Sequence, residues 1–227
     1  VQALRVEIAR KLDRENGLKY DPNQVLLSNG AKHSLYNVFM AILRPGDEVV
    51  IPSPYWLSYP EMIKVAGGVP VFVPCREAND FKMTPEEFEK AITPRTKALV
   101  LNSPSNPVGN VYTRSELKAI AGVAVRHGVL VVSDEIYEKM VYEKAEHVSI
   151  GSLDKKMFDL TITVNGFSKA YAMTGWRIGY LAASADIVKA INAFQSHSTS
   201  GPNTFAQYGA LEALQGPVPV GGFTFGL

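Results

Sequence analysis

The stretch "NGFSKAYAMTGWRIGY" at residues 165–180 places two cations in an apolar, glycine-rich setting. Lys169 and Arg177 are eight residues apart, and no carboxylate lies within the stretch. Neighbours such as Trp176 are not typical of a solvated surface. The stretch also continues a β-rich run that begins at residue 160. We therefore expect these cations to meet an electrophilic or anionic group.

Short apolar runs alternate with helical patterns on both sides of this stretch. The runs predict strands at residues 24–28, 48–51, 69–73, 97–102, 129–133, 160–165 and 178–184. They are continuous rather than alternating, which is typical of strands that helices cover on both faces. Strand–helix alternation indicates a mostly parallel sheet. The predicted fold class is therefore α/β, with three layers in the order α/β/α.

Start and stop signals mark several of the intervening helices, which are expected at residues 1–17, 31–43, from 84 onward and 113–128. Thr84 with Glu87, and Thr113 with Glu116, have the spacing of capping boxes. Gly128 is a natural residue to follow a helix end. Residues 215–227 contain no charge but four glycines and two prolines, and we expect a tail there.

Composition narrows the possible function classes. The 227 residues suit one good-sized domain, and a net charge of +1 argues against a general nucleic-acid or membrane-surface binder. No run approaches the roughly 18 apolar residues of a membrane span. The single cysteine, Cys75, excludes an internal disulfide and fits a reducing compartment. We therefore predict a cytoplasmic protein with neither nucleic acid nor membrane as partner.

The first residues of the sequence and its histidines lead to two further expectations. The sequence opens on Val1, in what reads as an amphipathic helix already under way, so we expect it to begin within a longer protein. The four histidines share no metal-ligand spacing and are expected at the surface or at helix caps. No metal site is predicted.

Polar and aromatic residues follow the carboxyl ends of the predicted strands, the edge at which open α/β sheets bind ligands. They are Gly30, Ala31 and Lys32, then Trp56, Asn106, Asp134, Tyr137 and Lys169. Each has an ordinary structural explanation when taken alone. The Gly30–Lys32 segment could be a simple strand–helix turn, Asp134 the N-cap of a short helix at 134–140, and Trp56 a core residue. Asn106 would by default be a turn residue and Tyr137 a half-buried aromatic.

Lys169 decides between these explanations, because a lysine at a strand end in apolar company can attack a carbonyl as an amine nucleophile. An aldehyde cofactor with a phosphate and a basic pyridine nitrogen would use the whole set. The Gly30–Lys32 turn and Arg177 would bind the phosphate, and Asp134 would bind the pyridine nitrogen. Asn106 and Tyr137 would bind the ring oxygen, and Trp56 would cover the ring. The cofactor predicted is pyridoxal 5'-phosphate.

The same motifs resemble the large domain of class I, fold-type I pyridoxal-phosphate aminotransferases, most closely the bacterial aspartate/prephenate branch. They are "NGAK" (29–32), "PGDEVVIPSPYWLSYPEM" (45–62), "NSPSNPVG" (102–109), "SDEIYE" (133–138) and residues 165–180. The resemblance implies that Lys169 forms the Schiff base, that Asp134 pairs with the pyridinium and that Tyr137 completes the catalytic set. It also implies that Gly30, Ala31, Lys32 and Arg177 bind the phosphate. Trp56 and Asn106 are implied to contact both cofactor and substrate.

The resemblance covers residues 1–214, which it implies to be the cofactor-binding large domain. The family's N-terminal arm and C-terminal small domain have no counterpart in this sequence, and the small domain carries the arginine for the substrate α-carboxylate. Two positions depart from the family pattern. Val108 replaces the threonine of Asn-Pro-Thr-Gly, and Gly166 replaces a phosphate-binding serine.

The resemblance implies transamination between an amino acid and a 2-oxo acid, with aspartate or a related dicarboxylic or aromatic donor. It also implies a homodimer in the full-length form, with residues 56–59 and 196–204 facing the partner. Two alternatives remain open. The same core serves β-elimination lyases, and a chain of this length could be an inactive truncated product or the cofactor-binding module of a regulator. A DNA-binding domain would favour the regulator, and this chain has none.

Overall fold

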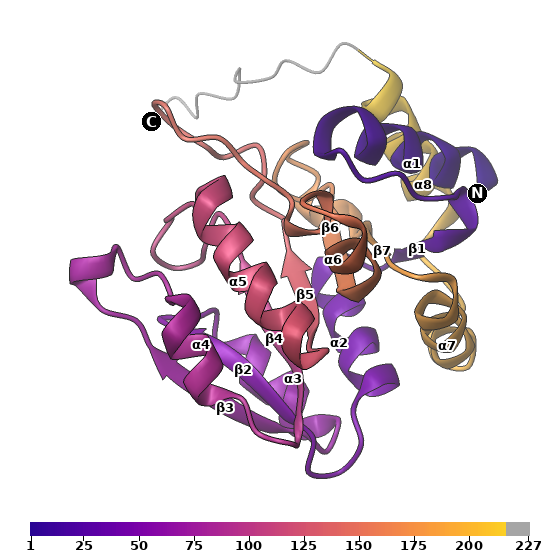
Figure 1. The fold of residues 1–227 in the computed structure, drawn as a ribbon. Coiled ribbons are helices and arrows are strands. Elements are labelled where there is room, and N and C mark those ends of the chain that lie inside the picture. The colour runs from indigo at the N-terminus through magenta and orange to yellow at the C-terminus, as the bar shows by residue number, and fades with distance from the viewer. Residues whose placement is uncertain (217–227) are drawn as a thin grey trace.

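The computed structural model describes residues 1–216, and Figure 1 shows their sheet between layers of helices. Within this range the strands are β1 (Val25–Ser28), β2 (Glu48–Ser53), β3 (Val69–Pro74), β4 (Thr96–Asn102), β5 (Leu130–Asp134), β6 (Thr161–Gly166) and β7 (Gly179–Ala182). The helices are α1 (Gln2–Asn16), α2 (Ala31–Ile42), α3 (Ser58–Val65), α4 (Pro85–Ala91), α5 (Arg114–His127), α6 (Lys155–Leu160), α7 (Ala185–Ser196) and α8 (Thr204–Gln215). All seven predicted strands are present.

The strands of residues 1–216 form one sheet in the order β1-β7-β6-β5-β4-β2-β3. The pairings of β2 with β3, β2 with β4, β4 with β5 and β5 with β6 are parallel. Only β7, within the described residues, runs antiparallel to both of its neighbours, β6 and β1. The mostly parallel sheet predicted from sequence is confirmed. Its topology brings the carboxyl ends of β1, β2, β4, β5 and β6 to one edge.

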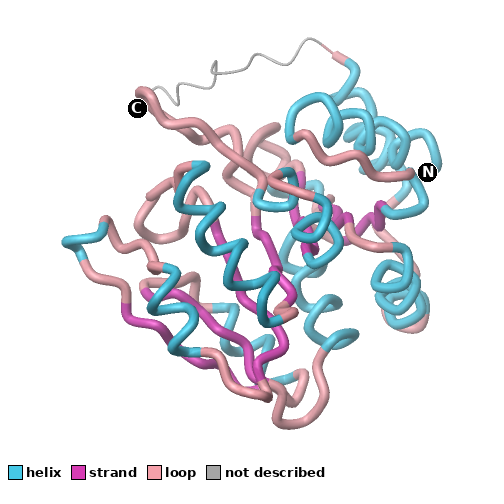
Figure 2. The backbone as a smooth tube through the Cα atoms, viewed as in Figure 1, coloured by secondary structure: helices cyan, strands magenta, loops and turns pink. Residues whose placement is uncertain are grey.

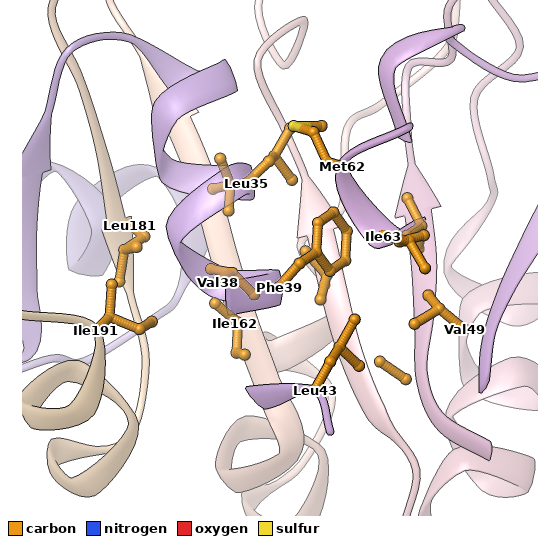
Figure 3. Close-up of a cluster of buried hydrophobic side chains, with 14 of the residues drawn as sticks. Leu35, Val38, Phe39, Leu43, Val49, Met62, Ile63, Ile162, Leu181 and Ile191 are labelled. Carbon is orange, nitrogen blue, oxygen red and sulfur yellow. The ribbon is translucent and has the colours of Figure 1, made fainter. Parts of the chain in front are cut away.

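One face of the sheet is covered by α2, α3 and α7, and Figure 3 shows the side chains between them. Phe39 of α2 is fully buried there and packs with Ile63 of α3. Ile191 of α7 lies in the same cluster with the strand residues Ile162 and Leu181. This layer holds α2, whose N-terminus reaches the carboxyl edge of the sheet, against the strands.

The opposite face is covered by α4, α5 and α6 over the centre of the sheet and by α1 and α8 over β1 and β7. Figure 1 shows α1 beside α8. Leu117 and Ile120 of α5 pack on Val131 of β5, and Leu12 of α1 packs near Leu27 of β1. Helices therefore cover both faces, and the predicted α/β/α layering is confirmed.

The local helix signals mostly agree with the structure. Thr84 and Thr113 both form capping boxes, and Gly128 ends α5 in the left-handed region with φ of 66°. β5 ends at Asp134, and residues 135–149 contain turns but no helix, as Figure 2 shows, which excludes the alternative explanation of Asp134 as the N-cap of a helix at 134–140. One expectation needs correction. α8 includes Gln215, where we predict a tail.

The remaining residues of the predicted tail, 217–227, lie outside the described part of the chain. Within residues 1–216, no helix combines the length and apolar character that crossing a membrane requires.

Candidate functional site

A pocket of about 380 Å³ opens at the carboxyl edge of the sheet. Its lining comes from the helix start after β1 and from the segments after β2, β4, β5 and β6. The lining residues are Ala31, Lys32, Leu35, Trp56, Tyr59, Asn102, Asn106, Asp134, Ile136, Tyr137, Ser168, Lys169, Thr174 and Arg177. Every residue that we predict to bind the cofactor is in this lining except Gly30. The strand ends thus bring together residues from far apart in the sequence.

Gly30 lies behind the pocket wall, at the N-cap of α2, with φ of 96°. A Cβ added to Gly30 would be only 2.7 Å from Nη2 of Arg177, so the missing side chain lets the guanidinium approach the turn. Gly179 of β7 is as tightly placed, because a Cβ there would lie 2.5 Å from the backbone nitrogen of Ala31. The first N–H groups of a helix have no partner inside the helix and attract anions. The turn and Arg177 therefore place free helix N–H groups beside a guanidinium, and we call this part of the pocket the cationic corner.

Arg177 is held by backbone groups on both sides of this corner. Its Nη1 donates to the carbonyl of Thr174 at 2.8 Å, and its Nη2 donates to the carbonyl of Asn29 at 3.4 Å. Arg177 itself has φ of 51°, in the left-handed region. The guanidinium keeps further N–H donors for a ligand, because it carries five.

Asp134 is the buried carboxylate of the pocket, with 3% of its surface exposed. The Tyr59 hydroxyl donates to its Oδ2 at 2.6 Å, and the backbone N–H of Ile136 donates to its Oδ1 at 3.3 Å. Burial raises the pKa of Asp134 to about 6, although the hydrogen bond from Tyr59 works against that rise. Asp134 is thus mostly ionised at neutral pH in a low-dielectric setting.

Tyr59 is a site residue that the sequence analysis missed. We expect residues 56–59 to face a partner subunit, but Tyr59 is 2% exposed and points its hydroxyl to Asp134, so this expectation is wrong for Tyr59. Its ring also packs edge-on against Trp56 at 5.3 Å between centroids. The sequence did contain a signal for Tyr59, because it follows the carboxyl end of the same strand as Trp56. A tyrosine hydroxyl also needs a hydrogen-bond partner when it is buried.

Asn106 and Tyr137 form a second polar group in the pocket. Nδ2 of Asn106 donates to the Tyr137 hydroxyl at 3.2 Å. Asn102, which the sequence analysis did not select, bonds the backbone of both Asn106 and Asp134. Its Oδ1 accepts from the backbone N–H of Asn106 at 2.7 Å, and its Nδ2 donates to the carbonyl of Asp134 at 2.9 Å. The loop after β4 and the turn after β5 are therefore locked together.

The two lysines of the pocket each lie over an aromatic ring. Nζ of Lys169 is 5.5 Å from the centroid of the Tyr137 ring, and Nζ of Lys32 is 4.8 Å from the centroid of the Trp56 ring. Cations near ring faces are attracted by the ring quadrupole. Lys169 thus has its amine beside Tyr137 in the lining that also contains Asp134.

The glycine at position 166 has a structural cause in this fold. Gly166 of β6 pairs with Gly179 of β7, and a Cβ at Gly166 would lie 3.1 Å from Cα of Gly179. A serine would therefore crowd the strand pair. Ser168 and Thr174 also line the pocket, and the Thr174 hydroxyl donates to the carbonyl of Ser168 at 3.0 Å. Thr174 is a further residue that the sequence analysis missed.

One histidine departs from expectation. We expect His147 at the surface or at a cap, but its side chain is 10% exposed and its Nε2 lies 3.1 Å from Oε2 of the buried Glu135. Glu135, Glu138 and His147 have potential ligand atoms within 4.8 Å of one another. Lys11, however, donates its ammonium to Glu138, which places a protein cation in this cluster. The residues behave as an ion-pair network.

The chain is similar in sequence and structure to known aminotransferases. The family model for class I and II aminotransferases matches residues 1–220. The aspartate aminotransferase of Geobacillus stearothermophilus is 55% identical over 95% of this chain, and the aspartate/prephenate aminotransferase of Cereibacter sphaeroides is 50% identical over 96%. The structure of aspartate aminotransferase from Thermus thermophilus with maleate is 50% identical over 94% of this chain, with a TM-score of 0.91.

The chain aligns with only part of the length of each of these proteins. It covers 55% of the Geobacillus protein, 54% of the Cereibacter protein and 55% of the Thermus chain. The chain therefore spans about half the length of the curated relatives it matches.

Proposed function

This chain belongs to the class I and II aminotransferases, and on that premise we propose that the whole protein transfers an amino group between an amino acid and a 2-oxo acid. The observation that carries the proposal is the convergence of Lys169, Asp134 and Arg177 on one pocket. An amine nucleophile, a buried carboxylate and a guanidinium beside a helix N-terminus are the groups that an aldehyde cofactor with a pyridine ring and a phosphate requires.

The family's cofactor is pyridoxal 5'-phosphate, and the donor set of the pocket fits it. The N–H groups at the start of α2 and the Arg177 guanidinium would hold the phosphate, with Lys32 at the same helix end. Asp134 would hold the pyridine nitrogen. Asn106 and Tyr137 would hold the ring oxygen. A Cβ at Gly30 would lie 2.7 Å from Nη2 of Arg177, so the glycine lets the guanidinium lie close to the start of α2, which supports the fit.

Lys169 and Trp56 complete the arrangement. Lys169 Nζ would bind the aldehyde carbon covalently, and the Trp56 ring would cover the face of the pyridine ring. The bound cofactor supplies an electron sink that lowers the cost of removing the proton at the substrate Cα. The protein's part is to keep Asp134 ionised, to orient the ring through Tyr137 and to supply a base.

Lys169 is the base that this pocket offers for the substrate Cα. When it is not bonded to the cofactor, its amine would be free to take up and return a proton. Tyr137 lies beside that amine, and its hydroxyl is already held by Asn106. The amine that would move the proton therefore lies next to the Tyr137 ring.

The amino donor that we propose is aspartate or a related dicarboxylic or aromatic amino acid. The names of the similar proteins, aspartate and aspartate/prephenate aminotransferase, support it, and maleate in the Thermus structure is a dicarboxylate. Trp56 and Asn106 would contact the substrate as well as the cofactor. We also propose that residues 1–214 form the cofactor-binding domain.

The proposal extends to assembly and location. We propose a homodimer, with the mostly exposed segment at residues 196–204 toward the partner. Phe205, with 77% of its surface exposed, adjoins this segment and supports the assignment. A cytoplasmic location is supported by the single buried and free Cys75, which fits a reducing compartment.

Activity of the full-length protein tests the reaction. With pyridoxal phosphate, aspartate and 2-oxoglutarate, we expect glutamate and oxaloacetate in equal amounts. Lys169→Ala should abolish turnover while the circular dichroism spectrum is kept, and Lys189→Ala, an exposed lysine of α7, should leave turnover unchanged. Release of ammonia without glutamate would instead identify a lyase. Turnover in Lys169→Ala equal to that of the wild-type protein would overturn the proposed site.

A further inference from the structure

A buried polar cluster adjoins the turn at residues 134–138 without entering the pocket. We call it the rear network, and its members are Lys11, Asn16, Glu135, Glu138, His147 and Ser149. None of them lines the pocket, whereas Asp134 and Tyr137 of the same turn do. The turn therefore alternates, with residues 134 and 137 directed to the pocket and residues 135 and 138 bonded to the network.

The network ties α1 to the loop that follows β5. Lys11 of α1 is 2% exposed and donates to Glu138, and Asn16 donates from Nδ2 to Oε2 of Glu138 at 2.8 Å. The same Nδ2 lies 2.9 Å from Oγ of Ser149. Burying ions is costly unless they are paired and fully hydrogen-bonded, so these contacts hold the two segments in one arrangement.

Glu135 is the member of the network that directly follows Asp134 in the sequence. It is 1% exposed. Its Oε1 accepts from the Ser133 hydroxyl at 2.9 Å, and its Oε2 accepts from the Ser149 hydroxyl at 2.6 Å. Oε2 also lies 3.1 Å from Nε2 of His147. Both carboxylate oxygens are thus fixed, and with them the backbone between β5 and the turn.

The charges of the network balance when His147 is protonated. Two carboxylates, Glu135 and Glu138, then face two cations, Lys11 and His147. Burial opposes a charge on His147, but Glu135 raises the pKa of the imidazole above its usual value. Nδ1 of the same ring has no hydrogen-bond partner within residues 1–216, so the described structure holds the ring through Nε2 alone. The positive charge of protonated His147 therefore balances the negative charge of Glu135.

We propose that Glu135 is a positioning residue for the pocket: bonded to His147 and Ser149, it fixes the turn that directs Asp134 and Tyr137 at the cofactor. The inference rests on the proposed function, since it assigns those two residues to the cofactor. Glu135 acts on Asp134 in two ways. It restrains the shared backbone, and its negative charge adds to the effect of burial in raising the pKa of Asp134.

The test compares Glu135→Gln with Glu138→Gln in the full-length protein. Each variant removes one buried charge and keeps the side-chain size, and both residues belong to the same network. Of these two residues, Glu135 is the one whose charge raises the pKa of Asp134. Two quantities are measured: the Asp134 titration by ¹³C NMR of the carboxyl group without cofactor, and the dissociation constant of pyridoxal phosphate.

We expect Glu135→Gln to lower the pKa of Asp134 and to weaken cofactor binding about tenfold, the scale on which residues behind a site's direct ligands act. Glu138→Gln should leave the Asp134 titration unchanged. An unchanged titration and affinity in Glu135→Gln, with wild-type protein that binds the cofactor, would overturn the positioning role. Failure of the wild-type protein to bind pyridoxal phosphate would instead overturn the proposed function.

A second pair keeps the inference testable if Glu135→Gln does not fold. His147→Gln retains an N–H donor for Glu135, and His147→Ala does not. A positioning role predicts that His147→Ala weakens cofactor binding about tenfold and that His147→Gln restores most of it. Equal affinity in wild type and His147→Ala, measured on protein that is folded by circular dichroism, would contradict the role.

Discussion

Asp134 is ionised in a place where ionisation is unfavourable, and this conflict sets its properties. Burial raises its pKa from 3.8 to about 6, so the folded state binds a proton more tightly than the unfolded state does. The group's contribution to stability is therefore fully present below pH 3.8 and is lost as pH rises through about 6. The difference of about 2 pKa units corresponds to about 3 kcal/mol at neutral pH. A positively charged ring nitrogen would offset this cost.

Asp134→Asn should therefore stabilise the cofactor-free protein at pH 7.5 by up to about 3 kcal/mol in free energy of unfolding, because it removes the buried charge. Near pH 3.5 the gain should nearly disappear, since both side chains are then neutral in the folded state. Urea denaturation at the two pH values measures it. Asp13→Asn, at an exposed position of α1, should show no such pH-dependent gain. A gain equal at both pH values would contradict the assignment of the charge.

Tyr59→Phe tests the other contact of this carboxylate. The Tyr59 hydroxyl lowers the pKa of Asp134 by donating to the charged form, so its removal should raise that pKa above about 6. NMR titration of the carboxyl group measures the shift. Tyr55→Phe is the matched control, because Tyr55 stacks on Phe72 and does not bond Asp134. A fall of the pKa in Tyr59→Phe would show that the hydrogen bond does not stabilise the carboxylate.

Among the elements, those with local signals could be predicted from sequence and those without them could not. The capping boxes at Thr84 and Thr113 specify helix starts through neighbouring residues. α3 begins at Ser58 after Leu57, with no side-chain cap, and depends on burial of Tyr59 and Ile63 against the sheet. Such packing involves residues distant in sequence, which a local pattern does not contain.

The close contact between β7 and the start of α2 can be tested by substitution of its glycine. A methyl group at Gly179 would meet the backbone of Ala31 at 2.5 Å, so Gly179→Ala should displace the turn at the start of α2, where we propose that the phosphate binds. We expect cofactor affinity to fall by tenfold or more, about 1.4 kcal/mol for each factor of ten. Gly175→Ala is the control, because nothing lies within 4 Å of its added carbon. Fluorescence titration with pyridoxal phosphate measures both, and equal affinities would refute the role of the close contact.

In the whole molecule, the sheet topology explains why most of the pocket could be predicted. Parallel strands bring their carboxyl ends to one edge, so residues between Ala31 and Arg177 meet although they are far apart in sequence. The rear network could not be predicted in this way. The contact of Lys11 with Glu138 joins a helix at the start of the chain to a loop more than a hundred residues later, and no strand order specifies it.

The central claim is that Lys169 is the amine that binds the cofactor, and covalent trapping tests it most directly. The full-length protein is incubated with pyridoxal phosphate, reduced with borohydride, digested and mapped by mass spectrometry. We predict the pyridoxyl label on the peptide that contains Lys169. Lys32 lines the same pocket and is the internal comparison. Label on Lys32 in place of Lys169, or on no lysine, would contradict the account.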